Sequence, residues 1–130
     1  MNKLKTVCYV IGVAQIVLGV LFLFAPGPFM AWMGLAVPPQ DTGYMLAMFA
    51  ARLLVFGGGM FVIARQPNEH RFWIDAMIGI QIIDAAAGAF YTATNIVPID
   101  ASAFPMFNAV VFAILLVSLR RFARLELKPA

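Results

Sequence analysis

Residues 5–25, KTVCYVIGVAQIVLGVLFLFA, form the apolar run that decides the fold. As a helix rising about 1.5 Å per residue, this run is long enough to cross about 30 Å of hydrocarbon. It ends in Pro-Gly-Pro without a small-residue cleavage site, so we interpret it as a retained membrane span and not as a signal peptide. Segments 43–64, 72–94 and 104–121 are similarly long and apolar.

The composition of the whole chain indicates the same class of protein. The 130 residues are 63% hydrophobic and only 12% charged, whereas soluble domains are roughly half apolar and a quarter charged. Backbone groups in hydrocarbon must form their hydrogen bonds internally, so the spans are expected to be helices. The sequence therefore predicts an all-α integral membrane four-helix bundle, with residues 1–130 forming one transmembrane domain.

The basic residues predict how the chain is oriented. Apart from Arg52, all of them lie outside the four spans or at their ends, and four crossings bring them to one side of the membrane: Lys3, Lys5, Arg65, Arg71, Arg120, Arg121, Arg124 and Lys128. The positive-inside rule places both termini on the cytoplasmic side. The pI of about 9.4 follows from this topology. Membrane lipid is thus an expected partner, and nucleic acid is not.

The connection between the first two spans, residues 26–42, combines prolines with large apolar side chains. A short helix lying in the membrane interface would use such residues, with Trp32 at the depth of the lipid headgroups. A proline-bounded loop packed over the end of the bundle would use them equally well. Both interpretations stay open.

Polar side chains interrupt the spans at Gln15, Arg52, Gln81 and Asp84. Arg52 and Asp84 each lie about 18 Å from the cytoplasmic end of their span, near the middle of the bilayer. A lone charge there costs about 2.5–3.5 kcal/mol on insertion scales. We therefore predict an Arg52–Asp84 ion pair inside the bundle, with Gln15 and Gln81 satisfying the remaining hydrogen-bonding groups. Asn108, in the outer third of the last span, either caps this cluster or bonds a neighbour.

Two interpretations of this cluster stay open. A buried ion pair with amide neighbours fixes the register of the helices, whereas a polar pocket binds a substrate headgroup, a quinone carbonyl or an ion. The glycines Gly12, Gly19 and Gly57–Gly59, together with the run DAAAGAF at 84–90, are typical of close helix packing in lipid. These small residues fit either interpretation.

The residues that carry most enzyme chemistry are scarce. Cys8 is the single cysteine and His70 the single histidine, which excludes dithiol chemistry and a haem held by two histidines of one chain. No nucleophile and base pair or metal-ligand pattern is apparent in the sequence. We therefore predict no catalytic residues, no metal and no cofactor, and enzymatic activity is the least favoured function.

The stretches LGVLFLFAPGPFMAWMGL and AARLLVFGGGMFVIA resemble the DoxX-like group of small bacterial four-helix membrane proteins. The resemblance covers most of the chain through loose motifs, and Arg52 is the position that matches best. It implies a multi-pass protein of the bacterial inner (plasma) membrane, associated with membrane redox systems such as quinone-dependent oxidoreductase complexes. It assigns no catalytic residue, and Asp84 has no clear place in the pattern of the group.

Three functions follow as hypotheses. The first is an accessory or ligand-binding subunit of a membrane redox system, with a quinone-like or lipid-like molecule held by the midplane cluster. The second is a small transporter that uses Asp84, although pairing with Arg52 would hinder such a cycle. The third is a purely structural or assembly subunit. A homo-oligomer and a larger membrane complex both remain open as partners.

Overall fold

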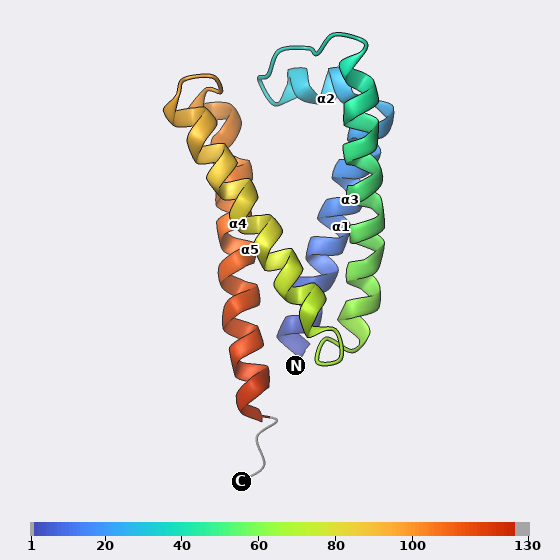
Figure 1. Cartoon of the computed structure of the whole chain (residues 1–130), viewed down its shortest axis with the longest axis vertical. Coiled ribbons are helices and arrows are strands. Elements are labelled where there is room, and N and C mark those ends of the chain that lie inside the picture. The colour runs from blue at the N-terminus through green and yellow to red at the C-terminus, as the bar shows by residue number, and fades with distance from the viewer. Residues whose placement is uncertain (1, 127–130) are drawn as a thin grey trace.

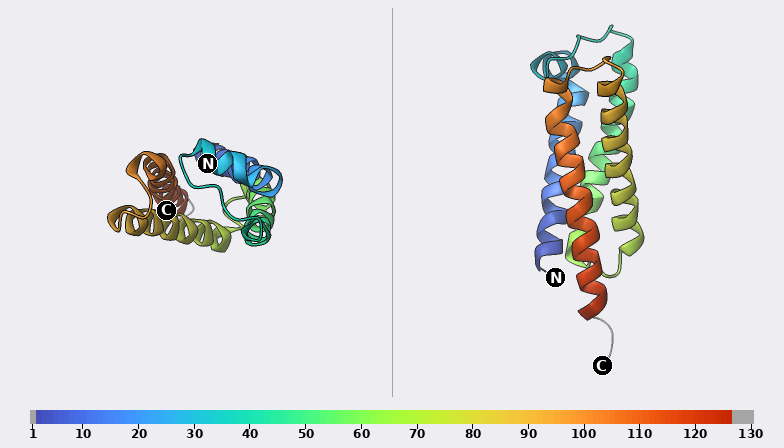
Figure 2. Two further views of the ribbon diagram at one scale, coloured as in Figure 1. Left: turned by 90° about the horizontal axis from the view of Figure 1, so that it is seen from above. Right: turned by 90° about the vertical axis from the view of Figure 1, so that its left-hand side faces the viewer.

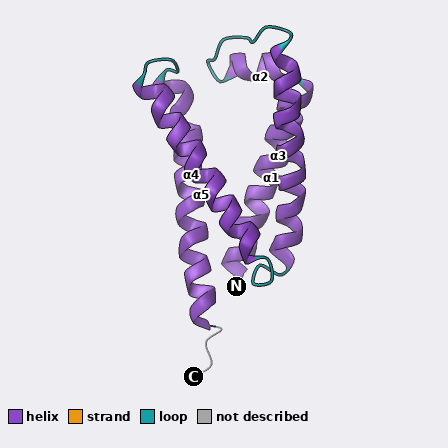
Figure 3. Cartoon of the chain, viewed as in Figure 1, coloured by secondary structure: helices purple, strands orange, loops and turns teal. Residues whose placement is uncertain are grey.

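A computed structural model describes residues 2–126, and all regular structure within that range is helical (Figure 3). The helices are α1 (Asn2–Phe24), α2 (Pro26–Trp32), α3 (Thr42–Arg65), α4 (Arg71–Ala93) and α5 (Ile99–Glu126). Four of them, α1, α3, α4 and α5, are long and apolar enough to cross a membrane. The predicted all-α class and the four apolar helices are thereby confirmed.

The last long helix begins earlier than the predicted span. The sequence predicted residues 95–103 as a connection, but α5 starts at Ile99, directly after Pro98. The Pro98 carbonyl accepts hydrogen bonds from the backbone N–H of Ala101 at 3.0 Å and from that of Ser102 at 3.2 Å. Pro105 therefore lies inside α5. It has no N–H to donate to the carbonyl four residues earlier, that of Ala101.

Helices α1 and α3 form a tight antiparallel pair through glycine. A Cβ atom added at Gly57 would lie 2.7 Å from Ile16 Cγ1 and 3.0 Å from the Gly12 carbonyl oxygen, so only glycine fits. A Cβ atom added at Gly58 or Gly59 would meet nothing within 4 Å. The prediction of close packing through small residues therefore holds for Gly12 and Gly57, whereas the other two glycines of the triplet lie outside this interface.

Helices α4 and α5 form the second antiparallel pair. Gly88 of α4 packs against the side chain of Met106. Near the other end of the pair, Arg120 Nε lies 2.8 Å from Asp75 Oδ1, and the Nη2 group donates to Oδ2 at 2.8 Å. The contact of Nε is an ion-pair distance without hydrogen-bond geometry, so the guanidinium donates one hydrogen bond to this carboxylate. The pair is therefore joined by packing at one end and by a hydrogen-bonded ion pair at the other.

The two pairs meet at the end that holds the N-terminus and diverge toward α2 (Figures 1 and 2). At the closed end all four long helices contribute to one buried core: Leu4, Cys8, Ile11, Met60, Ile63, Ala64, Ile74, Met77, Ile78, Phe112 and Leu116. The start of α1, the end of α5 and the loop 66–70 lie at this end (Figure 1). The described basic residues other than Arg52 therefore gather there.

The connection after α1 contains both of the structures that the sequence left open. Residues 26–32 are the short helix α2, and residues 33–41 are loop and turn. The Phe29 ring of α2 packs edge-on against Phe22 of α1, with ring centroids 5.1 Å apart. Trp32, at the end of α2, is 82% exposed. Helix α2 thus lies across the open end of the molecule, anchored to α1 (Figure 1).

Candidate ligand-binding cavity

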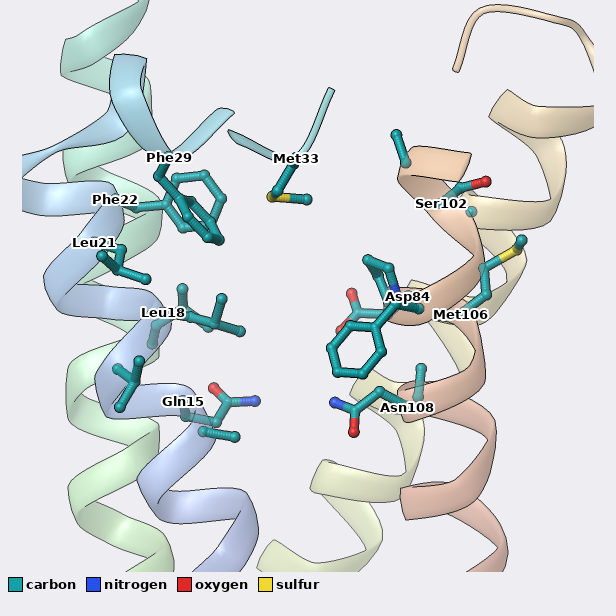
Figure 4. Close-up of a pocket in the computed structure, with 18 of the residues that line it drawn as sticks. Gln15, Leu18, Leu21, Phe22, Phe29, Met33, Asp84, Ser102, Met106 and Asn108 are labelled. Carbon is teal, nitrogen blue, oxygen red and sulfur yellow. The ribbon is translucent and has the colours of Figure 1, made fainter. Parts of the chain in front are cut away.

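A cavity of about 700 Å³ lies between the two helix pairs, on the open side of the core. All five helices contribute to its wall, which is mostly apolar and includes the rings of Phe22, Phe29, Trp32 and Phe49. Figure 4 shows the labelled side chains of α1 and α2 facing those of α4 and α5 across an open space. Pockets for small molecules typically measure about 300–1,000 Å³, so this cavity has the size of a ligand site.

Three of the four residues predicted to cluster do line this cavity: Gln15 of α1 and Gln81 and Asp84 of α4. The two glutamines are 9% and 4% exposed. Their Nε2 groups lie 3.9 Å and 3.4 Å from the sulfur of Met77, a core residue that links them across the two helix pairs. The amides therefore mark the boundary between the packed core and the cavity.

Arg52 does not join this cluster, and the predicted Arg52–Asp84 ion pair is not formed. Arg52 is exposed, does not line the cavity, and donates from Nη1 to the Met48 carbonyl of its own helix at 2.8 Å. It lies five residues before Gly57, which is about 140° around a helix of about 3.6 residues per turn. Since Gly57 faces α1, Arg52 points away from that partner. The depth of Arg52 along its span, estimated from the sequence, does not tell which way its side chain points around the helix.

Asp84 has a carboxylate without a protein partner. Among residues 3–121, whose side chains the structure describes, none forms a hydrogen bond or an ion pair with its side chain. Figure 4 shows the carboxylate pointing into the space between the helix pairs, with Asn108 on the same wall and Gln15 opposite. In its ionised form this group only accepts hydrogen bonds, so it can pair with a donor or a cation in the cavity.

Two further polar residues line the cavity. One is Asn108, for which the sequence left open whether it caps the cluster or bonds a neighbour. Ser102 also lines it, and its hydroxyl lies 2.6 Å from that of Thr92 on α4. The sequence had placed Ser102 in a loop. The signal that could have found it is Pro98, because a proline commonly precedes or opens the first turn of a helix.

The described residues contain no group of three or more His, Cys, Asp or Glu side chains that could hold a metal ion. Comparison with family models, curated proteins and solved structures finds no match for this chain. The DoxX-like resemblance therefore stays a prediction from the sequence. The fold and the cavity define the class of protein as one with four potential membrane spans and an open cavity between two helix pairs.

Proposed function

We propose that this protein binds a lipophilic small molecule in the cavity between its two helix pairs. The cavity itself carries the proposal: an apolar and aromatic wall of ligand size, with a few polar groups gathered at one level. The quinone-like and lipid-like ligands predicted from the sequence both belong to this class. Service as a subunit of a membrane redox system is a further part of the proposal and rests on the DoxX-like resemblance alone.

The position of the cavity favours a ligand that arrives from the membrane. Most of its wall belongs to helices that are apolar enough to lie in lipid, and the two pairs diverge on this side of the core (Figure 1). Exposed rings such as Phe49 and Phe104 are among the lining residues. An amphipathic molecule can place its tail against such rings and its polar head beside Asp84 and Asn108.

The test uses three probes that share a decyl chain: decyltrimethylammonium, decylubiquinone and decanoate. Binding to the protein in lipid nanodiscs is measured by isothermal titration calorimetry, with empty nanodiscs as the reference. We expect saturable binding of at least one probe. Leu18→Trp places a larger side chain on the cavity wall and should weaken that binding about tenfold or more, which corresponds to about 1.4 kcal/mol.

Val20→Trp is the matched control. Val20 lies on the same helix but is exposed outside the cavity lining, so this variant should bind as the unsubstituted protein does. Absence of saturable binding for all three probes would contradict the proposal. Equal binding by both tryptophan variants would contradict it too, because the cavity would then not be the site.

A small transporter is the second candidate function, and one observation favours it. The objection from the sequence was that Arg52 would hold Asp84 in an ion pair, and the structure has no such pair. The check is ethidium uptake into proteoliposomes under an imposed pH gradient. Uptake by the unsubstituted protein that is lost in Asp84→Asn supports transport, and equal uptake by protein-free liposomes rejects it.

The proposed orientation places both termini in the cytoplasm of a bacterium, with the protein in the inner membrane. It is supported by the basic residues at the closed end and by the two carboxylates, Asp41 and Asp100, near the open end. The cavity would then open toward the outer side of the membrane. A cysteine introduced at Thr94 should react with an impermeant maleimide added outside intact cells, and one introduced at Asn68 should not.

A further inference from the structure

The charged groups of the cavity are all of one sign. Asp84 and Asp100 line it, whereas no lysine, arginine or histidine does. The cation predicted to neutralise Asp84 is Arg52, which lies on the outward side of α3 with its guanidinium bound to the Met48 carbonyl. Of the residues that the structure describes, two carboxylates and no basic side chain therefore line the cavity.

The carboxylate of Asp84 is available to form an ion pair or a hydrogen bond with a ligand. It receives no hydrogen bond and no ion pair within the described part of the chain, and it projects into the cavity (Figure 4). A charged carboxylate inside the bilayer carries a free-energy cost unless it is paired or hydrated. An anionic head group would raise this cost by charge repulsion. A neutral carbonyl would bring a second acceptor and no donor. A cationic head group would lower the cost by pairing with the carboxylate.

The aromatic side chains of the cavity suit the same kind of head group. The rings of Phe22 and Phe29 pack edge to face at 5.1 Å, and Phe49 meets Phe22 at 5.4 Å. All three rings line the cavity. The faces of aromatic rings attract cations, most strongly where water is scarce. Rings and carboxylates therefore favour the same sign of charge.

We propose that the natural occupant of this cavity is a lipophilic cation: an amine or quaternary ammonium group on an apolar body. This inference rests on the proposed binding function and narrows it, because it ranks a cation above the quinone-like ligand. Asp84 pairs with the positive head, Asp100 adds negative charge near the open end, and the aromatic rings contact both the cation and the apolar body that carries it.

The experiment compares the same three decyl probes on the same nanodisc preparation. We expect decyltrimethylammonium to bind at least about tenfold more tightly than decylubiquinone or decanoate. Asp84→Asn keeps the shape of the side chain and removes its charge, so it should abolish this preference. Arg52→Gln is the matched control, because it also removes a midplane charge but lies outside the cavity, and it should leave the preference unchanged.

The outcomes separate the two proposals. Saturable binding of decylubiquinone or decanoate as tight as that of the ammonium probe overturns the inference and leaves the binding function standing. A preference for the cation that survives in Asp84→Asn also overturns it. Binding of none of the probes overturns both. Should Asp84→Asn fail to fold, the ranking of the three probes on the unsubstituted protein still decides.

Discussion

The closed half and the open half of the molecule use the same four long helices in opposite ways. At the closed half, side chains from α1, α3, α4 and α5 fill one core, and Arg120 holds Asp75 across the α4–α5 pair. At the open half, the two pairs diverge, a cavity of about 700 Å³ separates them, and the Asp84 side chain has no partner among the side chains that the structure describes. One half is thus filled by its own side chains, and the other leaves the cavity in which we propose that a ligand binds.

This difference indicates which half of the molecule holds the helices together. In lipid, helices associate through close packing and hydrogen bonds because the hydrocarbon is as apolar as the side chains. The closed half has both, through glycines, interlocked aliphatic residues and an ion pair. The open half has few such contacts between the pairs. Substitutions in the closed half should therefore change folding, and substitutions in the open half should change binding.

The largest effect is expected at the α1–α3 interface. Gly57→Leu places a branched side chain where even a Cβ atom would lie 3.0 Å from the Gly12 carbonyl oxygen. The two backbones would have to separate, so the free energy of unfolding should fall by about 3 kcal/mol or more. The measurement is SDS-induced unfolding in mixed micelles. Gly58→Leu, at a position with nothing within 4 Å, should remain close to the unsubstituted protein; equal losses would place the interface elsewhere.

A smaller decrease in the free energy of unfolding is expected when a side chain of the core at the closed end is truncated. Leu116→Ala removes a fully buried side chain and should cost about 2 kcal/mol, at the low end for such changes because the lipid reference state is already apolar. The same SDS titration measures it. Ile114→Ala, at an exposed position two residues away, is the control. A comparable decrease in the Ile114→Ala variant would contradict the assignment of Leu116 to the buried face of α5 and Ile114 to its exposed face.

The Asp75–Arg120 pair should contribute little, because both side chains are partly exposed. A double-mutant cycle with Asp75→Asn and Arg120→Gln should give a coupling free energy of about 0.5 kcal/mol, the range of exposed ion pairs. The coupling should decrease with added salt. A coupling of zero at low salt would mean that the pair does not form in solution.

The smallest effect on folding is expected at Asp84. Because the carboxylate has no protein partner, Asp84→Asn should change the free energy of unfolding by less than about 0.5 kcal/mol. The ion pair predicted from the sequence would instead make the same variant lose about 3–5 kcal/mol. A loss of that size, restored by adding Arg52→Gln, would reject the arrangement found in the structure.

Much of the fold was predictable, and the reason is the length of the apolar runs. Their lengths predicted four helices long enough to span a membrane, and the structure has them. The predicted start of the fourth span, residue 104, lies several residues after the start of α5 at Ile99. Pro105 lies inside the helix, which continues through it with one backbone hydrogen bond fewer.

The candidate site was predictable only in part. Gln15, Gln81 and Asp84 were found because polar residues are rare in apolar runs, and they do line one cavity. Arg52 met the same criterion and lies elsewhere. Depth along a helix follows from counting residues, whereas the direction of a side chain depends on which face its helix turns toward its neighbours.

The sequence by itself determined the helices, their approximate lengths, the grouping of basic residues at one end and the presence of polar side chains at mid-depth, because each depends on residue type and distance along the chain. The tertiary structure decided that the helices associate as two pairs, that the pairs separate on the side of α2, and that Asp84 faces a cavity while Arg52 faces away. These features depend on how glycine and large side chains set the distance and rotation between helices, which no single segment encodes.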